Sequence, residues 1–249
     1  LSINEPITMG AITLNSGQIN TRFGKSGFYV AGGCNAYLVA GLLTGTYNLG
    51  FLAGNYTGKE GTDQAWSVAN NHINKNVRNR CYKSETLDKN GLHGVYTVVD
   101  REILNTDFDF DFILVKGFVR AEMLLGGDFY ANFSTTSTMG ADAFFYVDVA
   151  AGLSSITGTS ISGGVLASAS FGAELTISDE EKKLAINGLI TLDIDAKVSQ
   201  SLVVGTISKE FNIGCYANAY VDSNGDSNFE FHKGNGKEVL KCEPVKDKK

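Results

Sequence analysis

Histidine, tryptophan, proline and cysteine are all scarce in this chain of 249 residues, which holds 3, 1, 2 and 4 of them, respectively. The histidines His72, His93 and His232 lie far apart and show no HExxH spacing, which argues against a zinc enzyme. A GxSxG nucleophile elbow, a complete phosphate-binding loop and a GxGxxG motif are also missing. We therefore expect a protein that is not an enzyme.

A concentrated basic region is also missing. The chain carries 21 Lys and Arg against 27 Asp and Glu, a formal net charge of −6, and the basic residues are scattered singly. Nucleic-acid binding needs a basic face, so we expect no nucleic-acid partner. The hydrophobic fraction of 43% is too high for a disordered chain. The length fits one large all-β domain or two small domains.

What the sequence does contain is a long alternation of apolar and polar residues from Asp128 to Val221, the two-residue period of half-buried strands. The runs 164–178 and 184–198 are about fifteen residues long, against about five or six for an ordinary strand. One parity is an apolar row rich in Ala with Phe, Val and Ile, which we expect to be buried against a second layer of protein. The predicted fold is all-β, a long-stranded antiparallel meander arranged as a sandwich or as stacked sheets, with one short covering helix.

The pattern divides the chain into three regions. Residues 1–106 form a Gly-rich β region with one helix and a polar loop, residues 107–233 form the long-stranded sheet, and residues 234–249 form a C-terminal tail. The uncharged stretch between Lys25 and Lys59 favours a buried pair of strands over a membrane-spanning helix. The one helix is predicted over Thr62–Arg80, with Thr62 or Asp63 as its N-cap.

The four cysteines are Cys34, Cys81, Cys215 and Cys242, and none forms a CxxC pair. Among the three possible connectivities, Cys34–Cys81 with Cys215–Cys242 closes the shortest loops. Such disulfides would place the protein outside the reducing cytoplasm, at a cell surface or secreted. The chain begins at Leu1 without a basic and apolar leader, as a matured secreted protein or a fragment does. Four buried free thiols are the alternative.

A polar segment from Asp222 to Asn228 partly resembles the start of a calcium loop. If an ion binds, its ligands are Asp222, Asn224 and Asp226. However, Gly225 comes one position too early, and a Lys stands where the bidentate Glu should be. The pair Asn224–Gly225 favours a type I′ hairpin turn instead. We expect no cofactor other than this calcium ion.

Two further groups of residues have a functional and a structural interpretation. Asp107, Asp109 and Asp111 share one strand face, which indicates the solvated face of an edge strand rather than a cation site or a paired-acid glycosidase centre. Several tyrosines are expected on the non-core face, where they would be scattered surface residues or a sugar-stacking platform. These are Tyr130, Tyr146, Tyr216 and Tyr220.

These features favour a non-enzymatic structural or assembly protein of an extracytoplasmic complex, which acts through protein–protein contacts of its β-sheets. We expect self-association or a partner chain, and membrane association only through a larger complex. An outer-membrane β-barrel is the first alternative, which the charged C-terminal tail and the Ala-rich row disfavour. A carbohydrate-binding β-sandwich is the second.

Overall fold

The computed structural model describes residues 1–74, 92–133, 136–179, 182–202 and 204–233. They form twelve strands, the α-helix α1 and the short 3-10 helix η1, and they confirm an all-β antiparallel meander with one covering helix. The elements are β1 (Ser2–Ile3), β2 (Ile7–Met9), β3 (Ile12–Gly24), β4 (Gly27–Leu38), η1 (Gly41–Leu43), β5 (Gly45–Tyr56), α1 (Lys59–Ala69), β6 (Leu92–Phe112), β7 (Val115–Phe133), β8 (Ser137–Ser155), β9 (Thr159–Ile177), β10 (Lys182–Leu202), β11 (Gly205–Asp222) and β12 (Ser227–Lys233).

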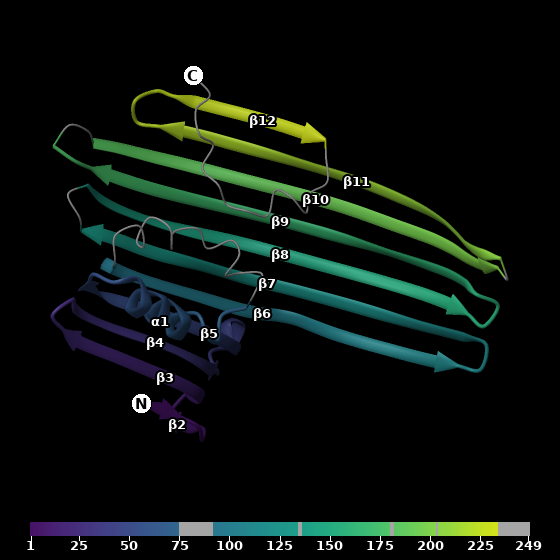
Figure 1. The fold of residues 1–249 in the computed structure, drawn as a ribbon, viewed down its shortest axis with the longest axis horizontal. Coiled ribbons are helices and arrows are strands. Elements are labelled where there is room, and N and C mark those ends of the chain that lie inside the picture. The colour runs from purple at the N-terminus through teal and green to yellow at the C-terminus, as the bar shows by residue number, and fades with distance from the viewer. Residues whose placement is uncertain (75–91, 134–135, 180–181, 203, 234–249) are drawn as a thin grey trace.

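All twelve strands belong to one sheet in the order β1-β3-β4-β5-β6-β7-β8-β9-β10-β11-β12, with β2 beside β3 (Figure 1). Strands β6 to β11 have 18 to 21 residues each, or about 60–70 Å at about 3.3 Å per residue. Because every described strand joins this sheet, the described residues do not form the expected second sheet. Strand β6 also crosses the boundary between residues 106 and 107 and pairs with β5 and β7.

The strand register defines two faces. Face A is the side that carries helix α1. It includes Tyr96 and Tyr130, which are register partners on β6 and β7, and Tyr146 on β8, whose register partner is Leu124. Face B is the opposite side, to which the alternate residues of each strand point. In β6 the pairing with β7 shifts between Glu102 and Leu104, so one extra residue is inserted there. This β-bulge reverses the parity of the following residues of β6.

Helix α1 lies on face A across β4 and β5 (Figure 1). Glycines permit this close approach: a Cβ added to Gly50 would stand 2.0 Å from the carbonyl oxygen of Ala69. Trp66 of the helix contacts the ring of Tyr96 edge-on, with 4.7 Å between ring centroids. The strands β4 and β5 confirm the predicted pair in the uncharged stretch. Within the described part of the chain, no helix has both the length and the hydropathy for crossing a bilayer.

The predicted bounds and cap of the helix were wrong. Helix α1 begins at Lys59 behind the N-cap Gly58, and Thr62 lies inside the first turn, where its hydroxyl donates to the Gly58 carbonyl at 3.0 Å. The helix ends at Ala69, and the side-chain amide of the C-cap residue Asn70 donates to the Trp66 carbonyl at 3.1 Å. Residues 75–80 of the predicted helix lie outside the described residues.

The prediction of which face is buried was also wrong. The largest fully buried strand residues lie on face A: Tyr29, Leu52, Asp100, Leu124, Tyr130, Thr191 and Asp193. On face B, in contrast, Phe171 is 59% and Ile190 is 62% exposed. Alternation distinguishes two faces of a strand, but it does not state which face is covered. Here the buried tyrosines and other large buried side chains lie on the more polar face, part of which helix α1 covers over β3, β4 and β5, and the apolar row stays exposed.

Candidate functional site

The most distinctive surface of the protein is face B. On β7, β8 and β9 it carries no Asp, Glu, Lys or Arg along the whole length of the strands. Its exposed side chains extend over the sheet from β7 to β12 and include Phe129, Phe145, Phe171, Ile190, Phe211 and Phe231. Monomeric soluble proteins rarely expose apolar patches of more than a few hundred Å², so a face of this kind indicates an interaction surface.

Face B contains a hollow of about 690 Å³ near the N-terminal strands. One register row of the sheet runs along it, Gly17, Cys34, Leu49, Val99 and Gly127, and Phe51 and Phe129 also line it. Burial raises the pKa of the Cys34 thiol. The shape and the apolar lining suit a hydrocarbon chain or an apolar side chain better than a polar substrate.

Face A has a different chemistry, because its buried polar groups are joined in hydrogen-bonded rows. Asn35 accepts from Asn15 and donates to Asn48, and Asn48 donates to Asp100 at 2.8 Å. The buried hydroxyl of Tyr130 donates to Glu174, and burial followed by this hydrogen bond raises the pKa of the tyrosine. These rows hold four neighbouring strands together, and sequence reasoning missed them because the amides are far apart along the chain.

The tyrosines predicted for the surface lie on face A. Tyr130 and Tyr146 are 0% and 3% exposed, so they belong to the core and not to an open stacking platform. Tyr216 and Tyr220 are half-buried on the same face. The interpretation of all four as surface aromatics was therefore wrong for the first two. The tyrosines were placed on the correct side of the strands, but that side is the covered one.

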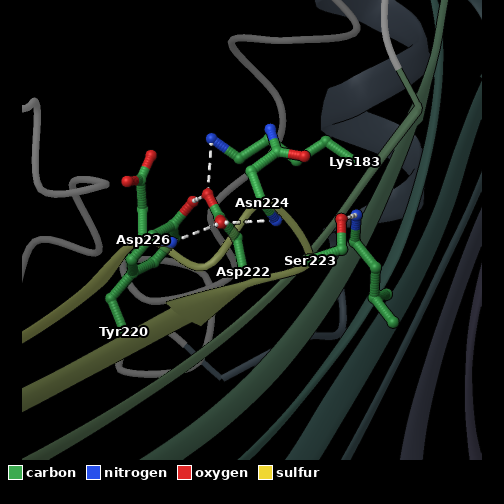
Figure 2. Close-up of polar contacts among 7 residues, drawn as sticks. Lys183, Tyr220, Asp222, Ser223, Asn224 and Asp226 are labelled. Atoms are coloured by element: carbon green, nitrogen blue, oxygen red, sulfur yellow. Dashed lines mark hydrogen bonds and ion pairs between the residues drawn. The ribbon is translucent and has the colours of Figure 1, made fainter.

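The polar segment after β11 forms a turn around Asp222 (Figure 2). One oxygen of the buried Asp222 carboxylate accepts the backbone N–H groups of Asn224 and Asp226 at 3.0 and 3.1 Å. The other accepts from Lys183 Nζ and from the Tyr220 hydroxyl, each at 2.8 Å. The hydrogen bond from Lys183 is the main cause that lowers the pKa of Asp222 to about 2.

These contacts account for the segment as a turn that is tied to the start of β10. The type I′ geometry was a wrong prediction, because only Gly225 has a positive φ, of 90°, whereas that turn also needs one at Asn224. Among the described residues, no group of three or more His, Cys, Asp and Glu side chains is placed to hold a metal ion. Calcium binding by Asp222, Asn224 and Asp226 stays a prediction, and Lys183 already supplies a cation to Asp222.

The three aspartates of β6 lie on face A, at the end of the sheet farthest from α1. Asp107 pairs with Arg120 at 3.1 Å and Asp111 with Lys116 at 2.6 Å, all with side chains more than half exposed. They follow the β-bulge and sit on a strand segment whose outer edge has no partner among the described residues. This arrangement agrees with the interpretation of a solvated face on an edge strand.

The cysteines are only partly described. Cys34 on β4 and Cys215 on β11 are half-buried and form no disulfide among the described residues, and Cys81 and Cys242 lie outside those residues. Six strands of the sheet separate β4 from β11. Because bonded cysteines need Cα atoms within about 7 Å, a Cys34–Cys215 disulfide does not fit this sheet. The predicted pairs Cys34–Cys81 and Cys215–Cys242 stay a prediction.

Comparisons with protein-family models, with curated proteins and with solved structures found no match to this chain.

Proposed function

We propose that this is a non-enzymatic assembly protein of an extracytoplasmic surface, and that another apolar surface covers its face B in the working form. The observation that carries the proposal is the extent of the exposed apolar face. The six long strands β6 to β11, about 4.8 Å apart and about 60 Å long, present an area on the order of 1,500 Å² on this face. A partner that covered it would bury about 3,000 Å² in total from the two surfaces, which is in the range of obligate complexes.

The polar chemistry of face A supports a structural role. Several of its ionisable groups form contacts between neighbouring strands, such as the Lys197–Glu210 pair and the Asp222–Lys183 pair. The open edges of the sheet add a second mode of assembly, because an edge strand presents backbone groups for pairing with another strand. Cell-surface or secreted localisation is part of the proposal and depends on the cysteine pairing.

Sedimentation velocity in detergent-free buffer and in a nonionic detergent tests the proposal. We expect assemblies without detergent that dissociate when the detergent covers face B. Ile190→Lys with Ile213→Lys, both on face B, should weaken this assembly. The control is Asn212→Lys with Ser208→Lys, which adds the same charge at exposed positions of face A. A wild-type chain that sediments as a monomer at every concentration without detergent would contradict the proposal.

A further inference from the structure

Strands β6 to β11 extend beyond the N-terminal strands, as the right-hand part of Figure 1 shows. The last pair between β5 and β6 joins Tyr47 to Arg101, and β6 then continues through residues 102–112. The matching parts of the other strands, by register, are residues 115–124, 146–155, 159–168, 191–202 and 205–216. We call these six segments the extension. Each has 10 to 12 residues, and a bilayer-spanning β-strand has about 9–11.

The turns at the end of the extension are apolar and exposed. Ile113 and Leu114 between β6 and β7 are 94% and 59% exposed, Ile156 between β8 and β9 is 68% exposed, and Val204 between β10 and β11 is 94% exposed. At the opposite end of the same strands, the described residues include Asp179 and Lys182 at the β9–β10 connection and the turn around Asp222 after β11. The turns at one end of the long hairpins are therefore apolar, whereas two of the connections at the other end carry charged residues.

The apolar turns are continuous with face B. Across the extension, face B carries one charged side chain among the described residues, Lys209 on the edge strand β11. Face A of the same segments carries the ion pairs Asp107–Arg120, Asp111–Lys116 and Lys197–Glu210. The extension thus has an apolar face B, a face A that carries ion pairs, and apolar turns at its end.

We infer that the extension inserts into a lipid bilayer, with its apolar turns leading and face B against the acyl chains. This inference rests on the proposed function, because it names the surface that covers part of face B. A protein partner would account for the apolar face. It would not account for strand segments of bilayer length that end in apolar turns, while the β9–β10 and β11–β12 connections at the other end carry charged residues. Lys209 has a long apolar stem and reaches the headgroup region from an edge strand.

Insertion imposes a requirement on the edges of the extension. A bilayer offers no hydrogen-bond partners, so the outer backbone edges of β6 and β11 must be paired within it. A second copy of this chain supplies that pairing. Because the extension has six antiparallel strands, β11 of one copy placed beside β6 of the next continues the antiparallel order. Copies joined in this way enclose face A on a common, water-filled side.

The experiment uses vesicles of phosphatidylcholine with brominated acyl chains, which quench tryptophan on contact. The native Trp66 is the only tryptophan, and it lies in α1 away from the extension. We expect that vesicles leave the wild-type emission unchanged and quench the added emission of Ile156→Trp at the apolar end. Asp179→Trp, at the charged end, is the matched control and should stay unquenched.

Flotation with the same vesicles gives the partition constant. Val149→Lys on face B should lower it by about tenfold or more, whereas Ala150→Lys, its neighbour on face A, should leave it unchanged. Equal quenching of Ile156→Trp and Asp179→Trp, or no flotation of the wild type, would overturn the inference. If the wild type does not float but still assembles in detergent-free buffer, only the bilayer inference fails. A wild type that does neither contradicts the proposed function as well.

Discussion

Asp100 and Asn74 join the segment after helix α1 to the centre of the sheet. The buried Asp100 carboxylate on β6 accepts the backbone N–H of Asn74 at 2.7 Å, and its other oxygen accepts the side-chain amide of Asn48 at 2.8 Å. The Asn74 side chain continues to Glu122 on β7 at 2.9 Å. One carboxylate therefore fixes where the chain leaves the helix and where β5 meets β6.

Asp100→Ala tests the importance of this junction. The substitution removes the acceptor of two half-buried donors, and an unpaired donor costs up to about 1–3 kcal/mol when it is buried. We expect a loss of about 2–4 kcal/mol in the free energy of unfolding, measured by urea denaturation. Asp109→Ala, at an exposed position of the same strand, is the control and should change stability by about 0.5 kcal/mol or less. Equal losses in the two variants would contradict this view of the junction.

Gly50→Ala tests the contact between helix and sheet. The added methyl group would meet the Ala69 carbonyl oxygen at 2.0 Å and a methyl of Val98 at 2.9 Å, so the helix must move away. We expect a lower melting temperature and a red-shifted emission of Trp66 as it leaves the ring of Tyr96. Gly188→Ala is the control, because its nearest contact would be 3.8 Å away on the open face B. A Gly50→Ala variant as stable as Gly188→Ala would mean that the helix does not lie against this strand.

Much of the fold was predictable because the strands are long and strictly alternating. The segments between Asp128 and Val221 repeat every two residues, which only extended strands satisfy. The covered face was not predictable, since Phe171 and Ser170 differ in polarity but occupy equivalent positions on opposite sides of one strand. Burial depends on contacts between distant parts of the chain: the register pairs Tyr96 with Tyr130, and Trp66 of the helix contacts Tyr96. Each of these contacts joins residues that are 30 or more positions apart.

The contacts in the candidate sites were also hard to predict, because they join residues that are far apart in the sequence. The turn at Asn224–Gly225 was recognisable from a local pair of residues, but the partner Lys183 comes from the previous strand and has no local signal. The Asp100 junction likewise needs residues from β5, β6 and the segment behind the helix. The β-bulge at Ile103, which carries Phe108 and Phe110 to face B, has no sequence signature that alternation alone detects.

The ion pair of Asp222 with Lys183 predicts a specific acid sensitivity. The folded chain holds the pKa of Asp222 near 2, below its ordinary value, chiefly through the hydrogen bond from Lys183. The stabilisation is therefore complete above the ordinary pKa of an aspartate and is lost as the pH falls from about 4 towards 2. Lys183→Gln should shift the acid unfolding of the β11–β12 hairpin to higher pH, as followed by hydrogen exchange of the Asn224 and Asp226 amides. An unshifted transition would mean that the pair does not anchor the turn.

The strand order limits which cysteines can form disulfides. If the cysteines are oxidised in the native protein, Cys34 should be linked to Cys81 or Cys242, and no peptide should join Cys34 to Cys215. Peptide mapping of the unreduced, alkylated protein by mass spectrometry checks this. The hypothesis of an oxidising compartment predicts no alkylated cysteine, whereas four alkylated cysteines would contradict it. A Cys34–Cys215 peptide would contradict the strand order itself.

Replacing the buried Asp193 by an apolar residue should stabilise the protein. It is 1% exposed on face A of β10, and among the described residues neither carboxylate oxygen has a hydrogen-bond partner. Burying a polar group without a partner costs about 1–3 kcal/mol, and a β-branched apolar residue of similar size suits a strand. We expect Asp193→Val to raise the free energy of unfolding by about 1–3 kcal/mol in urea denaturation. The control is Asp195→Val, two residues along on the same face, which should change stability little. If Asp193→Val is instead destabilised, the carboxylate has a ligand in solution, and repeating the denaturation with and without added divalent cations would show whether that ligand is a metal ion.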